Sequence, residues 1–64
     1  MLEEDYRSRR AKLVSEFLRM KQLRLYRSAA ARVRQIAKLD YDQIGEKIEK
    51  TYANFGYYDL IKKG

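Results

Sequence analysis

Apolar residues recur at helical spacing through the first part of the chain, and no Gly or Pro interrupts them before Gly45. This segment consists mostly of Ala, Leu, Arg, Lys, Gln, Glu and Met, which are strong helix formers. The pattern predicts one long helix over about residues 3–37, which can break near Ser28, a weaker helix former than its neighbours. The apolar positions cover about half of its circumference, so the helix is expected to pack against two neighbours.

A second helix is predicted to begin at about residue 41. Asp40 is a favourable N-cap residue, and Gln43 follows three positions later, as in a capping box. Beyond Gln43, apolar side chains again recur at helical spacing, at Ile44, Ile48, Tyr52 and Phe55.

Two ends of this second helix are compatible with the sequence. In the first interpretation it ends near Phe55, Gly56 forms a left-handed cap, and residues 57–63 form a short helix or turn. In the second it ends near Glu49, and Thr51 caps a further helix over residues 52–63 that contains Gly56. Gly56 is better explained by the first and Thr51 by the second, so both stay open.

These elements predict an all-α single domain over residues 1–64, with more than 60% helix. So short a chain buries only about 60% of its surface on folding, and this one has no Cys to form disulfides. We therefore expect a helical bundle completed by a partner, either another copy or a larger protein subunit. The expected interface residues are Leu13, Phe17, Leu18, Met20, Leu25 and Ile36, and those expected to be buried in the assembly are Leu18, Leu25, Ile44, Ile48 and Phe55.

Charge changes this picture, because the formal net charge is +6 and the basic residues are concentrated. Residues 17–39 contain no acidic residue and seven basic ones: Arg19, Lys21, Arg24, Arg27, Arg32, Arg34 and Lys38. On one continuous helix, Lys12, Arg19, Arg27 and Arg34 project from a single sector. They form either a solvated face or a ridge that follows the phosphates of a nucleic acid.

The residues for most enzymatic chemistry are missing. The chain has no His and no Cys, so it lacks the commonest general base, the strongest nucleophile and the usual zinc ligands. It has no glycine-rich phosphate loop and no apolar run of about 18 residues that could span a membrane. We expect a non-enzymatic, intracellular protein, nuclear or bacterial, with no cofactor, metal, membrane or small-molecule substrate.

Residues 40–64 resemble a helix-turn-helix. Residues 40–48 are similar to the first helix of that motif, Thr51 stands where the family often has a Ser cap, and Asn54-Phe55 matches its polar–apolar pair. Glu49 departs from the pattern, since the turn usually has Gly there, and so does Lys50, where an apolar residue is usual. The resemblance implies a DNA-binding recognition helix on which Asn54 and Tyr57 reach base edges, Asn being suited to adenine.

A shorter segment, Val14 to Ala29, resembles a basic helix in the N-terminal region of Enhancer of zeste-type Polycomb subunits. That resemblance implies docking on partner proteins in chromatin complexes, and it does not continue beyond Ala29. Both resemblances point toward DNA or chromatin. We therefore predict a small basic helical module that binds DNA or chromatin, mainly through phosphate contacts of Lys12, Arg19, Arg27 and Arg34. The alternative is a protein–protein interaction module whose apolar face joins a bundle.

The tyrosines add one expectation, because four of the six lie within residues 41–64. Tyr52 follows the apolar helical spacing and is expected in the core. Tyr57 and Tyr58 are adjacent, so a regular element cannot bury both on one side. One of them is expected to face a partner or to stack on a base.

Overall fold

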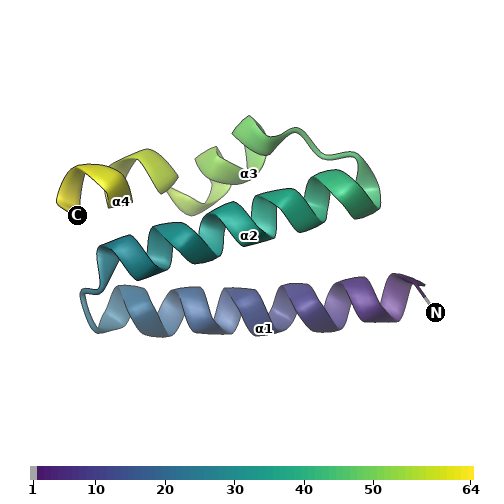
Figure 1. Cartoon of the computed structure of the whole chain (residues 1–64), viewed down its shortest axis with the longest axis horizontal. Helices are drawn as coiled ribbons and strands as arrows, with labels where there is room; N and C mark the ends of the chain where they lie inside the picture. Colours follow the sequence, from purple (N-terminus) through teal and green to yellow (C-terminus); the bar gives the residue numbers. More distant parts are fainter. Residues whose placement is uncertain (1) are drawn as a thin grey trace.

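The structure is a computed structural model and describes residues 2–64. Four helices account for 87% of this part of the chain. They are α1 (Leu2–Gln22), α2 (Tyr26–Ile44), α3 (Ile48–Phe55) and α4 (Tyr57–Lys63). Figure 1 shows α1 and α2 as an antiparallel hairpin, with α3 and α4 returning head to tail along the other side of α2. The prediction of an all-α fold with more than 60% helix is therefore confirmed.

The single helix predicted over residues 3–37 is wrong, because the chain reverses between Gln22 and Tyr26. Arg24 adopts a left-handed conformation, with φ of 62°. Its N–H donates to the Lys21 carbonyl at 3.0 Å, and that of Leu25 donates to the Met20 carbonyl at 2.8 Å. These two hydrogen bonds form a Schellman motif, which normally uses Gly at the left-handed position. The break thus precedes Ser28 and occurs at Arg24, a residue type that does not predict a left-handed conformation.

The second helix does not begin near residue 41, because α2 continues to Ile44. Asp40 lies inside this helix and is 2% exposed, so it is not an N-cap. The helix ends at Gly45, which is left-handed with φ of 67°, and the N–H of Gly45 donates to the Tyr41 carbonyl at 3.1 Å. The capping-box pattern failed because Asp40 bonds side chains of other helices instead of the first turn of its own.

Gly56 separates the last two helices, as the first interpretation of the C-terminal part predicted. It is left-handed, with φ of 65°, and caps α3 immediately after Phe55. The alternative boundary near Glu49 is wrong, since Glu49 lies in the first turn of α3. Thr51 is buried inside α3 and caps no helix. A continuous helix over residues 52–63 is therefore absent, and Tyr57 begins a helix of its own.

Helix α2 is the centre of the molecule, since it contacts α1 on one side and α3 and α4 on the other. The core consists of side chains that are almost fully buried: Phe17, Ala29, Ala30, Val33, Ile36 and Leu60. Small alanines on α2 allow the neighbouring helices to approach closely. The Cα atoms extend over 36 × 21 × 13 Å, so the three helical rows form a flat layer.

The predicted interface residues divide between this core and the surface. Phe17 and Ile36 are buried in the chain's own core, which removes them from any interface of this fold. Leu13 and Met20 pack partly against the same core. Of the five residues expected to be buried in the assembly, Phe55 is half-buried in the single chain. The other four are exposed, namely Leu18, Leu25, Ile44 and Ile48.

Candidate nucleic-acid interface

The hairpin collects cationic side chains at the end of the molecule where α1 turns into α2. Lys21 is in the last turn of α1, Arg24 in the turn and Arg27 in the first turn of α2, while α4 ends there with Lys62 and Lys63. A β-carbon on Gly64 would lie 3.1 Å from Cγ of Arg27, which places the end of α4 against the start of α2. These five residues are called the basic end.

A shallow hollow of about 320 Å³ marks this junction. It is lined by side chains and backbone of the turn, of the first residues of α2 and of the last residues of α4: Arg24, Leu25, Tyr26, Arg27, Ser28, Lys63 and Gly64. The Lys63 amino group is 5.4 Å from the centre of the Tyr26 ring, a cation–π contact. Three cations therefore border one concave surface.

Two further features keep this end positive. The first turn of α2 contains no acidic residue and Leu25 provides no side-chain cap, so the partial positive charge of the helix N-terminus is uncompensated. Glu16, in α1, forms an ion pair with Arg32 and not with a residue of the basic end. Arg32 Nε lies 3.1 Å from Glu16 Oε1, although the Nε–H does not point at the carboxylate. Three acidic residues lie around the opposite end of α2: Asp42 and Glu49, which are exposed, and Glu46, which is half-buried.

A strip of cations continues from the basic end along α2. Arg27, Ala30 and Arg34 share one side of α2, and together with Ile61 and Gly64 they line a second hollow of about 320 Å³. Arg34 Nη1 donates a hydrogen bond to the Tyr57 hydroxyl at 3.1 Å. Three of the predicted nucleic-acid contacts, Arg27, Arg34 and Tyr57, are thus brought together.

The other three predicted contacts lie elsewhere. The break between α1 and α2 puts Lys12 and Arg19 on α1, so the single ridge expected on one continuous helix does not form. Both are exposed. Asn54 is exposed near the end of α3, whereas Tyr57 lies beyond Gly56 in α4, so they do not project from one recognition helix.

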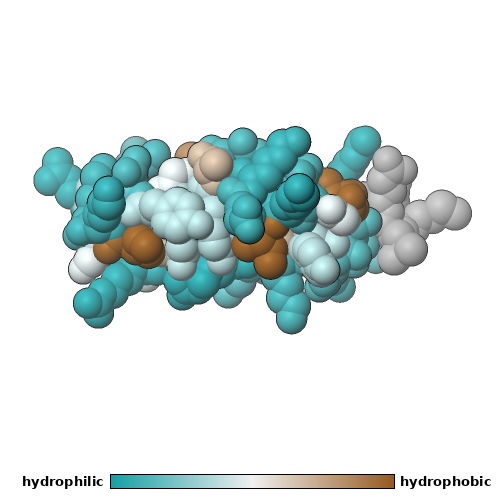
Figure 2. Space-filling model, turned by 90° about the horizontal axis from the view of Figure 1, so that it is seen from above, coloured by the Kyte–Doolittle hydropathy of each residue, from teal (hydrophilic) through white to brown (hydrophobic). Residues whose placement is uncertain are grey.

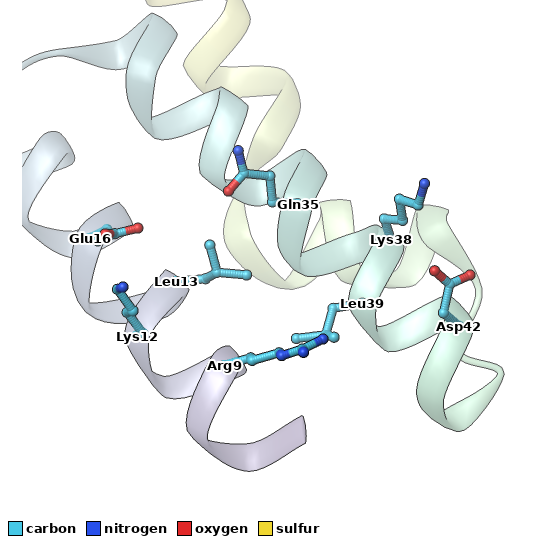
Figure 3. Close-up of a pocket in the computed structure, with 8 residues that line it drawn as sticks. All are labelled: Arg9, Lys12, Leu13, Glu16, Gln35, Lys38, Leu39 and Asp42. Atoms are coloured by element: carbon cyan, nitrogen blue, oxygen red, sulfur yellow. The ribbon is translucent and has the colours of Figure 1, made fainter. Parts of the chain in front are cut away.

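Another hollow, of about 530 Å³, lies on the seam between α1 and α2 (Figure 3). Leu13 and Leu39 form its apolar part, and the Arg9 side chain extends across it toward Leu39. Its rim mixes cations with anions, since Arg9, Lys12 and Lys38 lie beside Glu16 and Asp42, together with the neutral Gln35. Because neither sign of charge dominates, this groove is a weaker candidate for a nucleic acid than the basic end.

A buried polar network holds the helices in register. The Asp40 carboxylate accepts hydrogen bonds from the Tyr6 hydroxyl at 2.7 Å, Arg10 Nε at 3.0 Å and Thr51 Oγ1 at 3.1 Å. Arg10 Nη2 lies 3.4 Å from the second carboxylate oxygen, and its guanidinium carbon is 5.6 Å from the Phe55 ring centre. One carboxylate on α2 therefore ties α1 and α3 to the central helix.

The network perturbs its own titrating groups. Burial, followed by the hydrogen bond to Asp40, raises the pKa of Tyr6 above its ordinary value. The same carboxylate raises the pKa of Arg10, although burial acts in the opposite direction. The sequence does contain a signal for this arrangement, because Asp40 continues the apolar series Val33, Ile36, Ala37 at helical spacing. A carboxylate on a buried stripe requires partners.

Comparison with known proteins adds no family, since no family model matches the chain and no curated protein or solved structure is similar enough to be counted as a match. Among the side chains that the structure describes, those of residues 5–64, no group of three acidic, His or Cys residues is placed to hold a metal ion. Over the same residues, none of the helices combines the length and apolar character that crossing a bilayer requires.

Proposed function

We propose that this chain is a non-enzymatic module that binds nucleic acid through its phosphates, using the basic end and the Arg27–Arg34 strip. The observation that carries the proposal is the separation of charge along the molecule. The hairpin turn and the end of α4 gather cations around one hollow, while at the other end Asp42, Glu46 and Glu49 are interspersed with Lys47 and Lys50, and Lys50 pairs with Glu46 at 3.7 Å. Solubility requires a net charge, but it does not require the cations to be gathered at one end of the molecule.

Phosphate contacts suit the side chains present. Arg offers several N–H donors on a planar fork that matches phosphate oxygens, and Lys adds a mobile point charge. Such contacts supply affinity without base specificity. The positions of Asn54 and Tyr57 in separate helices give no support to base reading from one recognition helix, so the proposal is a DNA- or chromatin-binding protein without strong sequence preference. A nucleic-acid ligand also implies an intracellular protein.

A second candidate function, protein–protein interaction, has an observation of its own. The outer side of α1 presents an apolar stripe of the exposed Ala11 and Leu18 and the half-buried Val14, and all three line a hollow of about 450 Å³. Apolar side chains at i, i+3 and i+7 are the positions that a partner helix contacts. The two functions are compatible, because this stripe and the basic end involve different residues.

The proposal is tested by fluorescence anisotropy with labelled oligonucleotides of about 12 nucleotides, one single-stranded and one duplex, at several salt concentrations. Wild-type affinity should fall steeply with salt. Changing Arg24, Arg27 and Lys63 to Gln should flatten the slope of log affinity against log salt by roughly 2–3 units, since each phosphate contact contributes about 0.7–0.9.

The matched control changes three other exposed cations, Arg9, Lys38 and Lys47, to Gln. It removes the same net charge from outside the basic end, so its slope should change by less than about one unit. Equal effects of the two triple variants would refute the assignment to the basic end. Absence of salt-dependent binding to either oligonucleotide would refute nucleic-acid binding and favour the interaction module.

A further inference from the structure

Three tyrosines form a packed cluster at the junction of α3 and α4. The rings of Tyr52 and Tyr57 are stacked, with centres 4.1 Å apart and planes inclined by 18°. Tyr58 meets both rings edge to face, at 6.0 Å from Tyr52 and 5.5 Å from Tyr57. The cluster holds Tyr58 in place before any ligand arrives, which lowers the entropic cost of using its ring for binding.

Tyr58 remains 53% exposed although it contacts two other rings. Ile61 and Lys62 follow it at i+3 and i+4, so the three side chains share the solvent side of α4, and Leu60 faces the core. Figure 2, which views the molecule from the α3–α4 side, shows pale and brown side chains over the α4 end with hydrophilic ones around them. This surface combines an aromatic ring, an aliphatic side chain and a cation.

The cationic strip borders the tyrosines directly. Arg34 is fixed beside them by its hydrogen bond to the Tyr57 hydroxyl, which uses one N–H of the guanidinium. A guanidinium has five N–H donors, so others stay available for an anion. Ile61 belongs both to the solvent side of α4 and to the hollow that Arg27 and Arg34 line. A polyanion that follows the strip therefore passes next to the exposed ring.

We propose that the ligand is single-stranded nucleic acid, with one base stacked on Tyr58 and the adjoining phosphates on Arg34, Arg27 and Lys62. The inference rests on the proposed function and narrows it. Bases of a duplex are already stacked on one another, and a side chain can cover the face of a base only where the strand is unpaired. A row of cations beside an exposed aromatic ring is the arrangement that binds single strands without sequence preference.

One acidic residue works against this ligand. Asp59 follows Tyr58 directly and is exposed in the first turn of α4. Its carboxylate repels a phosphate that lies near Tyr58 or Lys62. Asp59→Asn should therefore strengthen binding to a single strand by a few-fold at low salt, and this gain should shrink as salt screens the charge.

The experiment compares labelled dT and rU strands of about 12 nucleotides with a duplex of equal length, by anisotropy at matched salt. Tyr58→Ala should weaken single-strand binding by about 5- to 150-fold, the equivalent of losing one stacked base. Tyr58→Phe should retain most of the affinity, because the ring remains. The control is Tyr41→Ala, since Tyr41 is 58% exposed in the last turn of α2, at the end of the molecule opposite the basic end.

Salt separates the stacking contribution from the phosphate contribution. Tyr58→Ala should leave the slope of log affinity against log salt unchanged, because it removes no ionic contact. Preference of dT over rU or the reverse identifies which single strand the site takes, and tighter binding of either than of the duplex supports the inference. Equal single-strand and duplex affinities, with Tyr58→Ala no weaker than Tyr41→Ala, would overturn it and leave the proposed function standing. Loss of all salt-dependent binding would overturn both.

Discussion

Replacing Asp40 by Ala should be among the most damaging changes in this small fold. The substitution removes an acceptor that Tyr6, Arg10 and Thr51 share through contacts of 2.7–3.4 Å. Removing one partner of a buried ion pair costs about 3–5 kcal/mol. The Arg10 side chain is 34% exposed, so water partly rehydrates its guanidinium and the expected loss falls to about 2–3 kcal/mol.

That loss is large beside the total stability, which for a chain of this length is about 3–10 kcal/mol. Thermal unfolding followed by circular dichroism should show a midpoint lower by about 10–20 °C, since one kcal/mol corresponds to about 4–8 °C in domains of this size. Asp42→Ala is the control, because Asp42 is exposed two residues away in the same helix. A loss near 1 kcal/mol, the value for an N-cap, would contradict the network and revive the capping interpretation.

Three further predictions concern pH, the turn and the core. The pKa of Tyr6 is raised above 10.0, so the contribution of Tyr6 to stability is complete below that pH and is lost as the pH rises through the raised pKa. Between about pH 9 and 11 the urea midpoint of Tyr6→Phe should therefore fall less than that of the wild type. Parallel plots of urea midpoint against pH for the two proteins would disprove the role of Tyr6. Arg24→Gly should raise the free energy of unfolding by about 1 kcal/mol, because Gly tolerates a φ of 62° without a β-carbon clash, and a loss of stability would contradict the left-handed turn. Ile36→Ala should cost about 2–5 kcal/mol, whereas Ile48→Ala, at a side chain 40% exposed, should cost less than about 1 kcal/mol; similar urea midpoints for the two would contradict the core described above.

Local rules were sufficient for the parts of the fold that depend on local chemistry. Helix content followed from propensity, and Gly56 followed from the need for a left-handed residue after Phe55. The hairpin turn was not predictable in this way, because Arg24 carries the left-handed cap without being Gly or Asn. The reversal is favoured by what it brings together, the packing of Phe17 against Ala29, Ala30 and Val33.

The residues of the candidate site likewise divide into those that the sequence identified and those that only the packing of the helices brings together. Composition and the acid-free run identified Arg27 and Arg34 as cations of interest, and the adjacent Tyr57 and Tyr58 led us to expect one ring to be exposed. Grouping Lys12 and Arg19 with them assumed one straight helix, and the turn removed that assumption. The proximity of Lys63 to Tyr26 and Arg27 depends on how α4 packs on α2, a long-range contact that no local pattern encodes.

The central claim, that nucleic acid binds at the basic end and the adjoining strip, is tested most directly by nuclear magnetic resonance. An amide correlation spectrum of the ¹⁵N-labelled protein would be recorded during titration with a dT strand of about 12 nucleotides and, separately, with a duplex of equal length. We predict that the largest shift changes occur within residues 21–34 and 57–64, and that residues 42–50 change little. Changes centred on residues 42–50 or on the groove between α1 and α2, or no changes in either titration, would contradict the claim.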